Sequence, residues 1–183
     1  MITVDLKNFL STGRFGNIDL GMNKAQVERS IGKPDYWMMT HFSRNERENS
    51  PIWRYGNIEF HFNGNCKLVS IYNDHLVDAG IYGGINIKLD CWVLLKENQK
   101  LVTIENQLDK EGFFYSKEYI NQEETSQIKI NLQSGVDLLF TSEREDYTVI
   151  TKTANYLLYG FELCQNVLHS LDEENSDLDF LIQ

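Results

Sequence analysis

Residues 21–37 read GMNKAQVERSIGKPDYW and predict a helix with both of its ends defined. Asn23 can cap the helix, and Gln26, three residues later, can reach back to it in a capping box. Gly32 favours an end to the helix, and Pro34 prevents its continuation. This stretch therefore predicts a short helix followed at once by a different kind of structure.

A second stretch, KLVTIENQLDKEGFFYS at residues 100–116, has the same layout but lacks the glycine and proline that end the first. Laid over each other, the stretches pair Val27 with Ile104, Ile31 with Leu108 and Trp37 with Phe114. The first two pairs fall on one apolar helix face. We expect Trp37 and Phe114 in the core, because large aromatic side chains are usually buried.

Strand periodicity follows each helix. Apolar residues occupy the even positions 52, 58, 60 and 62 of IWRYGNIEFHF (52–62) and 130, 132, 136, 138 and 140 of INLQSGVDLLF (130–140), and this alternation is typical of a strand with one buried face. The turn sequence at 63–65, Asn-Gly-Asn, predicts a hairpin into LVSIY at 68–72, and YTVIT at 147–151 corresponds to that third segment. Each unit is therefore expected to run helix, strand, strand, strand.

These patterns predict an α+β fold in which two divergent helix-plus-antiparallel-sheet repeats form a two-layer sandwich, with one continuous sheet as a variant. The first repeat, with the N-terminal segment, is expected over residues 1–80 and the second over 81–154, followed by a C-terminal segment over 155–183. GGINIKLDCWVLL at 83–95 alternates and predicts a strand that bridges the units. NYLLYGFELCQNVL at 155–168 fits either a strand or a helix.

The chain has a net charge of −10, with 27 acidic against 17 basic residues. Affinity for nucleic acid comes mainly from Lys and Arg that displace counterions from phosphates, so this balance argues against a nucleic-acid partner. The C-terminal segment holds no Lys or Arg and these acids: Glu162, Asp172, Glu173, Glu174, Asp177 and Asp179. This acidic tail has two interpretations, a solvated end or a segment that meets a basic partner.

Three widely spaced cysteines, Cys66, Cys91 and Cys164, indicate a reducing compartment rather than a disulfide framework. The first residues, MITVDLKNFL, lack the pattern of a signal peptide, and no apolar run is long enough to span a bilayer. We therefore expect a cytoplasmic protein with no membrane partner.

Strong catalytic motifs are absent, since the sequence has no glycine-rich phosphate loop, HExxH, GxSxG or paired CxxC. We therefore expect no enzymatic activity, no cofactor and no bound metal. One alternative is a metal site of His41, His61 and His75, which no local spacing joins. Another is a nucleophile pair of Cys66 with His61 across the hairpin turn.

A candidate binding face comes from the odd positions of the first strand segment, Trp53, Tyr55, Asn57, Glu59 and His61. We expect them to project from the sheet face opposite the helix, with Tyr72 and Arg54 extending the group. Aromatic side chains with charged neighbours on an exposed sheet are typical of a protein-binding surface. The alternative is that Trp53 and Tyr55 pack under the charged loop at 43–50 or between the units.

The helix and strand motifs also resemble those of a widespread, mostly uncharacterised bacterial family. Its members carry G-M-x-x-x-x-V-x-x-x-x-G-x-P-D in the helix and W-x-Y-G-x-[IL]-E-F-x-F in the strand. The matching positions here are Gly21, Met22, Val27, Gly32, Pro34, Asp35, Trp53, Tyr55, Gly56, Ile58, Glu59, Phe60 and Phe62. The helix motif is similar to that of the small outer-membrane-assembly lipoprotein and of beta-lactamase inhibitory protein, which has tandem helix-plus-sheet repeats. This resemblance implies a sheet surface that binds a partner protein.

Size, acidity and the lack of catalytic motifs favour an immunity-like protein that blocks a bacterial toxin or enzyme, in particular one with a basic domain. The residues expected to contact the partner are Trp53, Tyr55, Glu59, His61, Tyr72 and Arg54. A scaffold or assembly domain, homodimeric through a sheet edge, is the second interpretation. A small hydrolase that uses Cys66 or a histidine is the third.

Overall fold

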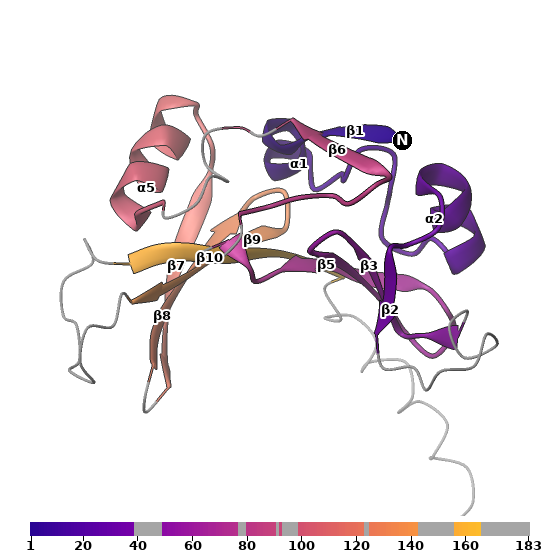
Figure 1. Cartoon of the computed structure of the whole chain (residues 1–183). Coiled ribbons are helices and arrows are strands. Elements are labelled where there is room, and N and C mark those ends of the chain that lie inside the picture. The colour runs from indigo at the N-terminus through magenta and orange to yellow at the C-terminus, as the bar shows by residue number, and fades with distance from the viewer. Residues whose placement is uncertain are drawn as a thin grey trace, which may run out of the picture.

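A computed structural model describes residues 1–38, 49–76, 80–90, 92, 99–122, 125–142 and 156–165. It has a mixed α+β fold with few helices and a large antiparallel sheet (Figure 1). The helices are α1 (Leu6–Thr12), α2 (Lys24–Ile31) and α5 (Leu101–Lys110). The strands are β1 (Ile2–Asp5), β2 (Tyr36–Met38), β3 (Ile52–Tyr55), β4 (Ile58–Phe62), β5 (Leu68–Asn73), β6 (Ile87–Asp90), β7 (Tyr115–Gln122), β8 (Thr125–Leu132), β9 (Val136–Ser142) and β10 (Tyr156–Cys164).

Eight of these strands form one sheet in the order β2-β3-β4-β5-β10-β9-β8-β7, and every neighbouring pair is antiparallel. Strands β2 to β5 follow one another as a meander, and so do β7 to β10. The two meanders meet at the centre of the sheet, where β5 pairs with β10 through Tyr72 opposite Glu162 and Ser70 opposite Cys164. The segment at 155–168, which fitted a strand or a helix, is thus a strand over its described part.

The expected bridging strand was placed wrongly. Over Ile87–Asp90 this segment forms β6, which pairs in parallel with β1 as a separate two-stranded sheet. The alternation of apolar residues was read correctly as a strand, since Ile87 is buried. Alternation shows only that one face is covered, however, and it does not identify the neighbouring strand.

The two predicted helices are present. In α2 the side chain of Asn23 accepts a hydrogen bond from the Gln26 amide at 2.9 Å, and the Gln26 side chain accepts one from the Asn23 amide at 2.9 Å. Gly32 follows with φ of 99°, a conformation that favours glycine. Helix α5 begins after Lys100 without a side-chain cap. Its stability therefore depends more on the packing of its apolar face against the sheet.

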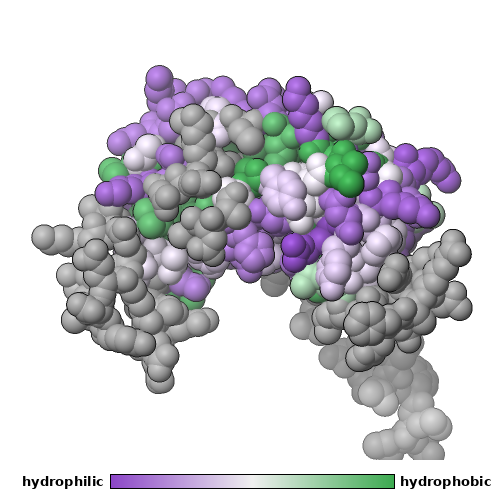
Figure 2. All heavy atoms as spheres, viewed as in Figure 1, coloured by the Kyte–Doolittle hydropathy of each residue, from purple (hydrophilic) through white to green (hydrophobic). Residues whose placement is uncertain are grey.

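The helices lie on one side of the large sheet, and no described helix lies on the other side (Figure 1). Their buried residues are Leu6, Phe9, Leu10, Val27, Ile31, Leu101, Ile104 and Leu108. Figure 2 shows hydrophilic residues along the outer side of the helices and hydrophobic ones between the helices and the sheet. The sheet arches beneath the helices, so the uncovered side, which we call the open face, is the concave one (Figure 1).

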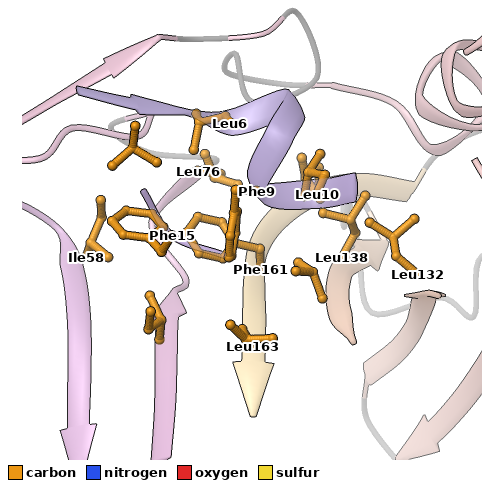
Figure 3. Close-up of a cluster of buried hydrophobic side chains, with 14 of the residues drawn as sticks. Leu6, Phe9, Leu10, Phe15, Ile58, Leu76, Leu132, Leu138, Phe161 and Leu163 are labelled. Atoms are coloured by element: carbon orange, nitrogen blue, oxygen red, sulfur yellow. The ribbon is translucent and has the colours of Figure 1, made fainter. Parts of the chain in front are cut away.

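The centre of the core is a chain of aromatic contacts beneath α1 (Figure 3). Phe9 of α1 makes edge-to-face contacts with Phe15 at 5.2 Å and with Phe161 of β10 at 5.4 Å between ring centroids. Phe15 in turn contacts Phe60 of β4 at 5.9 Å. The N-terminal helix therefore joins a strand of the first meander to a strand of the second.

The two aromatic residues that follow the helices differ in burial. Trp37 is partly buried and packs against the core, whereas Phe114 is 76% exposed, so its expected core position was wrong. Phe114 lies outside β7, which begins at Tyr115, and a residue beyond the strand end is not covered by the helix. None of the described helices is long and apolar enough to cross a membrane. The segments at 39–48, 147–151 and 166–183, which include the charged loop and most of the acidic tail, lie outside the described residues.

Phe161 and Phe114 provide a matched test of this packing. Phe161→Ala removes a fully buried ring and is expected to lower the free energy of unfolding by about 3 to 5 kcal/mol, through lost transfer energy and a cavity. Phe114→Ala removes an exposed ring and should change it by about 0.5 kcal/mol or less. Urea unfolding of both variants measures the difference, and equal losses would contradict the described core.

Candidate functional site

The turn between β3 and β4 decides which side chains reach the open face. Only Gly56 and Asn57 lie between the paired residues Tyr55 and Ile58. Gly56 has φ of 63° and Asn57 does not have a positive φ, the combination expected at the centre of a type II′ turn. With a two-residue loop, odd positions of β3 face the same side as even positions of β4.

This turn overturns part of the predicted binding face. The segment 52–62 was expected to be a single strand, whose odd positions share one face, but it contains a hairpin. Trp53 pairs with Phe60 in the core and is 3% exposed, and Tyr55 is fully buried. The expectation that Trp53 and Tyr55 project from the open face was therefore wrong. Both are buried, as in the alternative, but they lie beside α2 on the helix side of the sheet rather than between the units.

The motif residues around this turn hold it in place. The Gly56 amide donates to Oδ2 of Asp35 at 2.7 Å, and the Tyr55 hydroxyl donates to the Gly32 carbonyl at 2.8 Å. Burial raises the pKa of Tyr55, with the nearby Glu28 and Asp35 carboxylates adding to the effect. Tyr55 is thus a buried neutral donor that ties the end of α2 to the sheet.

Buried amides secure the other side of the turn. Asn57 donates through Nδ2 to the Gly80 carbonyl at 2.6 Å, and its Oδ1 accepts from the Tyr82 amide at 2.9 Å. Asn73 donates through Nδ2 to the Asn57 carbonyl at 2.7 Å. Both asparagines are almost fully buried. A buried amide group needs hydrogen-bond partners within the protein, and these contacts supply them. Asn57, expected on the open face, is therefore part of the architecture.

Four of the six predicted contact residues do share the open face. Residues directly opposite on antiparallel strands lie on the same face, and Arg54 is opposite Glu59, which is opposite Tyr72. His61 lies on the same face of β4, with its Nε2 3.0 Å from Oε2 of Glu59 and its ring 6.1 Å from that of Tyr72.

The register extends this group across the sheet as a row of directly opposed residues, which we call the polar row. From β3 to β7 it consists of Arg54, Glu59, Tyr72, Glu162, Asp137, Asn131 and Ser116. Neighbouring strands are spaced by about 4.8 Å, so its outer members are about 29 Å apart. The polar row thus crosses both meanders and the joint between β5 and β10.

Sequence reasoning missed the β10 part of this surface. A bulge in β10, between Leu158 and Gly160, leaves Tyr159 as the extra residue before Glu162 and Cys164. Tyr159 and Glu162 are half-exposed and Cys164 is exposed. The signal was the polar alternation of Glu162 and Cys164 after Gly160, but it is too short to separate a strand from a helix.

Electrostatics differ along the polar row. The bond from His61 lowers the pKa of Glu59, with Arg54 and His75 acting in the same direction and partial burial opposing them. Burial raises the pKa of Asp137, and the Glu162 and Glu118 carboxylates add to this although Lys129 lies 3.0 Å away. Glu59 is therefore stabilised as a carboxylate, whereas the fold disfavours the charge on Asp137.

Neither Cys66 nor Cys164 has the surroundings of a nucleophile. His61 contacts Glu59 and Tyr72, whereas Cys66 lies in the turn after β4 with Lys24 as an electrostatic neighbour, so the structure does not bring Cys66 and His61 together. Burial and a hydrogen bond to Glu162 raise the pKa of Cys164 to about 11. Cys164 is then a thiol at neutral pH, and the thiolate is the nucleophilic form.

The described residues form a small pocket and no metal-binding cluster. Among the described residues, which exclude His41, no group of three or more His, Cys, Asp or Glu is arranged to hold a metal ion. A pocket of about 220 Å³ lies on the helix side, between α1, the end of α5 and the loop after β8. Its charged residues, Lys7 and Glu111, form an ion pair at 2.5 Å at its rim.

Comparisons with protein-family models, with curated proteins and with solved structures find no match to this chain. The resemblance of its helix and strand motifs to a bacterial family therefore stays an expectation based on those residues.

Opposite pH dependences are expected for Glu59 and Asp137. The lowered pKa of Glu59 contributes stability that is present above its ordinary value of 4.5 and is lost as the pH falls through the lowered pKa. The raised pKa of Asp137 acts with the opposite sign, because stability falls as the pH rises from 3.8 through the raised pKa.

Urea unfolding of the wild type, Glu59→Gln and Asp137→Asn between pH 3 and 7 measures both effects. The stability advantage of the wild type over Glu59→Gln should grow with rising pH, and its advantage over Asp137→Asn should shrink. Slopes of the same sign for both variants would contradict the described electrostatics of the open face.

Proposed function

We propose that this chain is a non-catalytic protein-binding domain whose docking surface is the open face, and that it acts in the cytoplasm as an immunity-like inhibitor of a toxin or enzyme. The observation that carries the proposal is the polar row, which combines charged and aromatic side chains on a sheet face without a described helix. Polar side chains with aromatic anchors are what a non-obligate interface needs, since both partners are also stable in water.

The size of the polar row supports this proposal. A standard interface buries about 800 Å² on each partner, which as a circular patch is about 32 Å across. The row spans about 29 Å at the usual strand spacing. A partner seated along it would therefore contact both meanders and cover the joint between β5 and β10.

The order of elements supports a tandem-repeat origin, which we include in the proposal. Helix α2 precedes the meander β2 to β5, and α5 precedes the meander β7 to β10. Two such two-layer units, joined through their last strands, present one shared open face. The core residues correspond between the units, whereas the open face carries Tyr36 on β2 and His61 on β4 in the first unit but no aromatic residue or histidine on the described strands β7 to β9 of the second. A recognition surface that differs between otherwise similar units fits binding to one specific partner.

The proposal is tested by capturing a partner from cells of the source organism, purifying it, and measuring Kd by calorimetry. A His61→Ala, Tyr72→Ala variant should bind at least about 2 kcal/mol more weakly, about thirtyfold in Kd, because it removes an aromatic anchor and its neighbour. Tyr82→Ala is the matched control, because Tyr82 is 56% exposed but lies in the loop before β6. This control should retain the wild-type Kd.

Equal Kd values for the wild type and the double variant would contradict the open face as the docking surface. The inhibitory role is measured separately, as loss of the partner's activity on addition of one equivalent of this protein. Tight binding that leaves the partner active would contradict the immunity-like role and favour the scaffold interpretation.

A further inference from the structure

We propose that the open face takes an arginine side chain of its partner at Glu162, with the guanidinium group between the rings of Tyr72 and Tyr159. This inference rests on the proposed function, because it names the chemical group that the docking surface receives.

Carboxylates outnumber cations around Glu162. Glu162 of β10 lies directly opposite Asp137 of β9, and like charges directly opposite each other destabilise a sheet. Lys129 lies 3.0 Å from Asp137, and the Glu162 and Glu118 carboxylates are further electrostatic neighbours of the same lysine, so that one ammonium group faces three carboxylates. Within the described part of the chain, the hydrogen-bond donor to Glu162 is the thiol of Cys164 at 2.8 Å, and a thiol is a weak donor without charge.

Arg54, the one cation of the polar row itself, is turned away from Glu162. Arg54 lies at the β3 end of the row, where its Nε donates to the Gly56 carbonyl at 3.2 Å. Its guanidinium carbon is 5.9 Å from the centre of the Tyr36 ring, on the edge strand β2. Lys129 is thus shared among the carboxylates at the centre of the row, and a second positive group from outside would relieve their remaining repulsion.

The aromatic neighbours determine which positive group fits. Tyr72 lies directly opposite Glu162 on β5, and the bulge in β10 adds Tyr159 three residues before it. Burial raises the pKa of Tyr72 to about 12, with Asp74, Tyr159 and Glu162 adding to the effect. The pKa of Tyr159 is raised by burial and by Asp74 and Glu162. Both rings are therefore electrostatic neighbours of the same carboxylate.

A guanidinium group matches this combination better than an ammonium group. It is planar, stacks on aromatic faces, and donates two parallel hydrogen bonds to one carboxylate. A lysine ammonium supplies the charge but neither the stacking nor the two-bond geometry. The net charge of −10 on this chain would also speed the approach of a partner that presents arginine from a basic surface.

The test uses N-acetyl-arginine amide as the probe, titrated into isotopically labelled protein and followed by NMR of the tyrosine rings. Saturable shifts are expected for Tyr72 and Tyr159, and N-acetyl-citrulline amide, which has the same shape without the charge, should give none. Glu162→Gln should raise the Kd for the arginine probe by about tenfold or more, because a charge-assisted hydrogen bond is lost. Tyr72→Leu removes the aromatic ring and leaves every carboxylate in place, and it should also raise the Kd for the arginine probe.

Glu105→Gln is the control, because it changes the net charge by the same amount. Glu105 lies in α5 and pairs with Lys117 at 2.5 Å, so this variant should keep the wild-type affinity for the probe. Thermal unfolding adds a second measurement. Glu162→Gln should unfold at the same temperature as the wild type or higher, because it removes a like-charge contact.

The arginine site would be overturned if the arginine probe caused no shifts, or if the citrulline probe caused the same shifts. It would also be overturned if Glu105→Gln weakened binding of the arginine probe as much as Glu162→Gln does. A lowered unfolding temperature of the Glu162→Gln variant would overturn it too, because Glu162 would then be a structural residue. If the partner binds through His61 and Tyr72 but keeps its Kd with Glu162→Gln, the arginine site is overturned and the proposed function stands. If the probe binds as expected but no partner binds to the open face, the proposed function is overturned and the arginine site stands.

Discussion

The contacts of Phe9 with Phe15 and Phe161 are those on which the rest of the structure depends. They place one helix over strands from both meanders, since Phe15 also contacts Phe60 of β4 and Phe161 belongs to β10. Each meander alone has an apolar face that must be covered. Covering both from the same side leaves their other faces continuous, and this continuity creates the open face across eight strands.

A second constraint is the buried polar network around the turn of Gly56 and Asn57. A buried amide without partners costs about 1 to 3 kcal/mol, and here the buried Asn57 and Asn73 have backbone partners at Gly80 and Asn57, while the exposed Asp35 holds the Gly56 amide from outside. The network fixes where β3 ends and β4 begins. It therefore fixes which residues of β4 face the core and which, such as Glu59 and His61, face outwards.

The helix α2 was predictable almost to the residue, because its capping residues, its apolar face and its terminating glycine are all local in sequence. Helix α5 was also predictable, although its weaker signals left its start less certain. The candidate site was predicted in part. Glu59, His61, Tyr72 and Arg54 share the open face, but the aromatic pair Trp53 and Tyr55 lies in the core. The difference comes from one two-residue turn that shifts the parity of the pattern.

The second copy of the strand pattern did not show this shift. There the loop after β8 keeps even positions opposite even positions, as in Ile130 opposite Leu138, so reading 130–140 as one strand still placed Asn131 and Asp137 on one face. The contribution of β10 was beyond sequence reasoning for another reason. Tyr159 and Glu162 meet Tyr72 only because β10 pairs with β5, and the chain between them has no local signal for that pairing.

By itself, the amino-acid sequence determined the α+β class, the positions of α2 and α5 and the presence of alternating strands, because capping and periodicity depend on residues within one or two turns of each other. The N-terminal helix α1 was not predicted. Tertiary structure alone decided the joint between the meanders, the direction that each alternating pattern faces, and the meeting of Glu162 with Tyr72 and Asp137. These features depend on contacts between residues far apart in the chain. A strand pattern of period two is identical for either face until the turn and the neighbouring strand are in place.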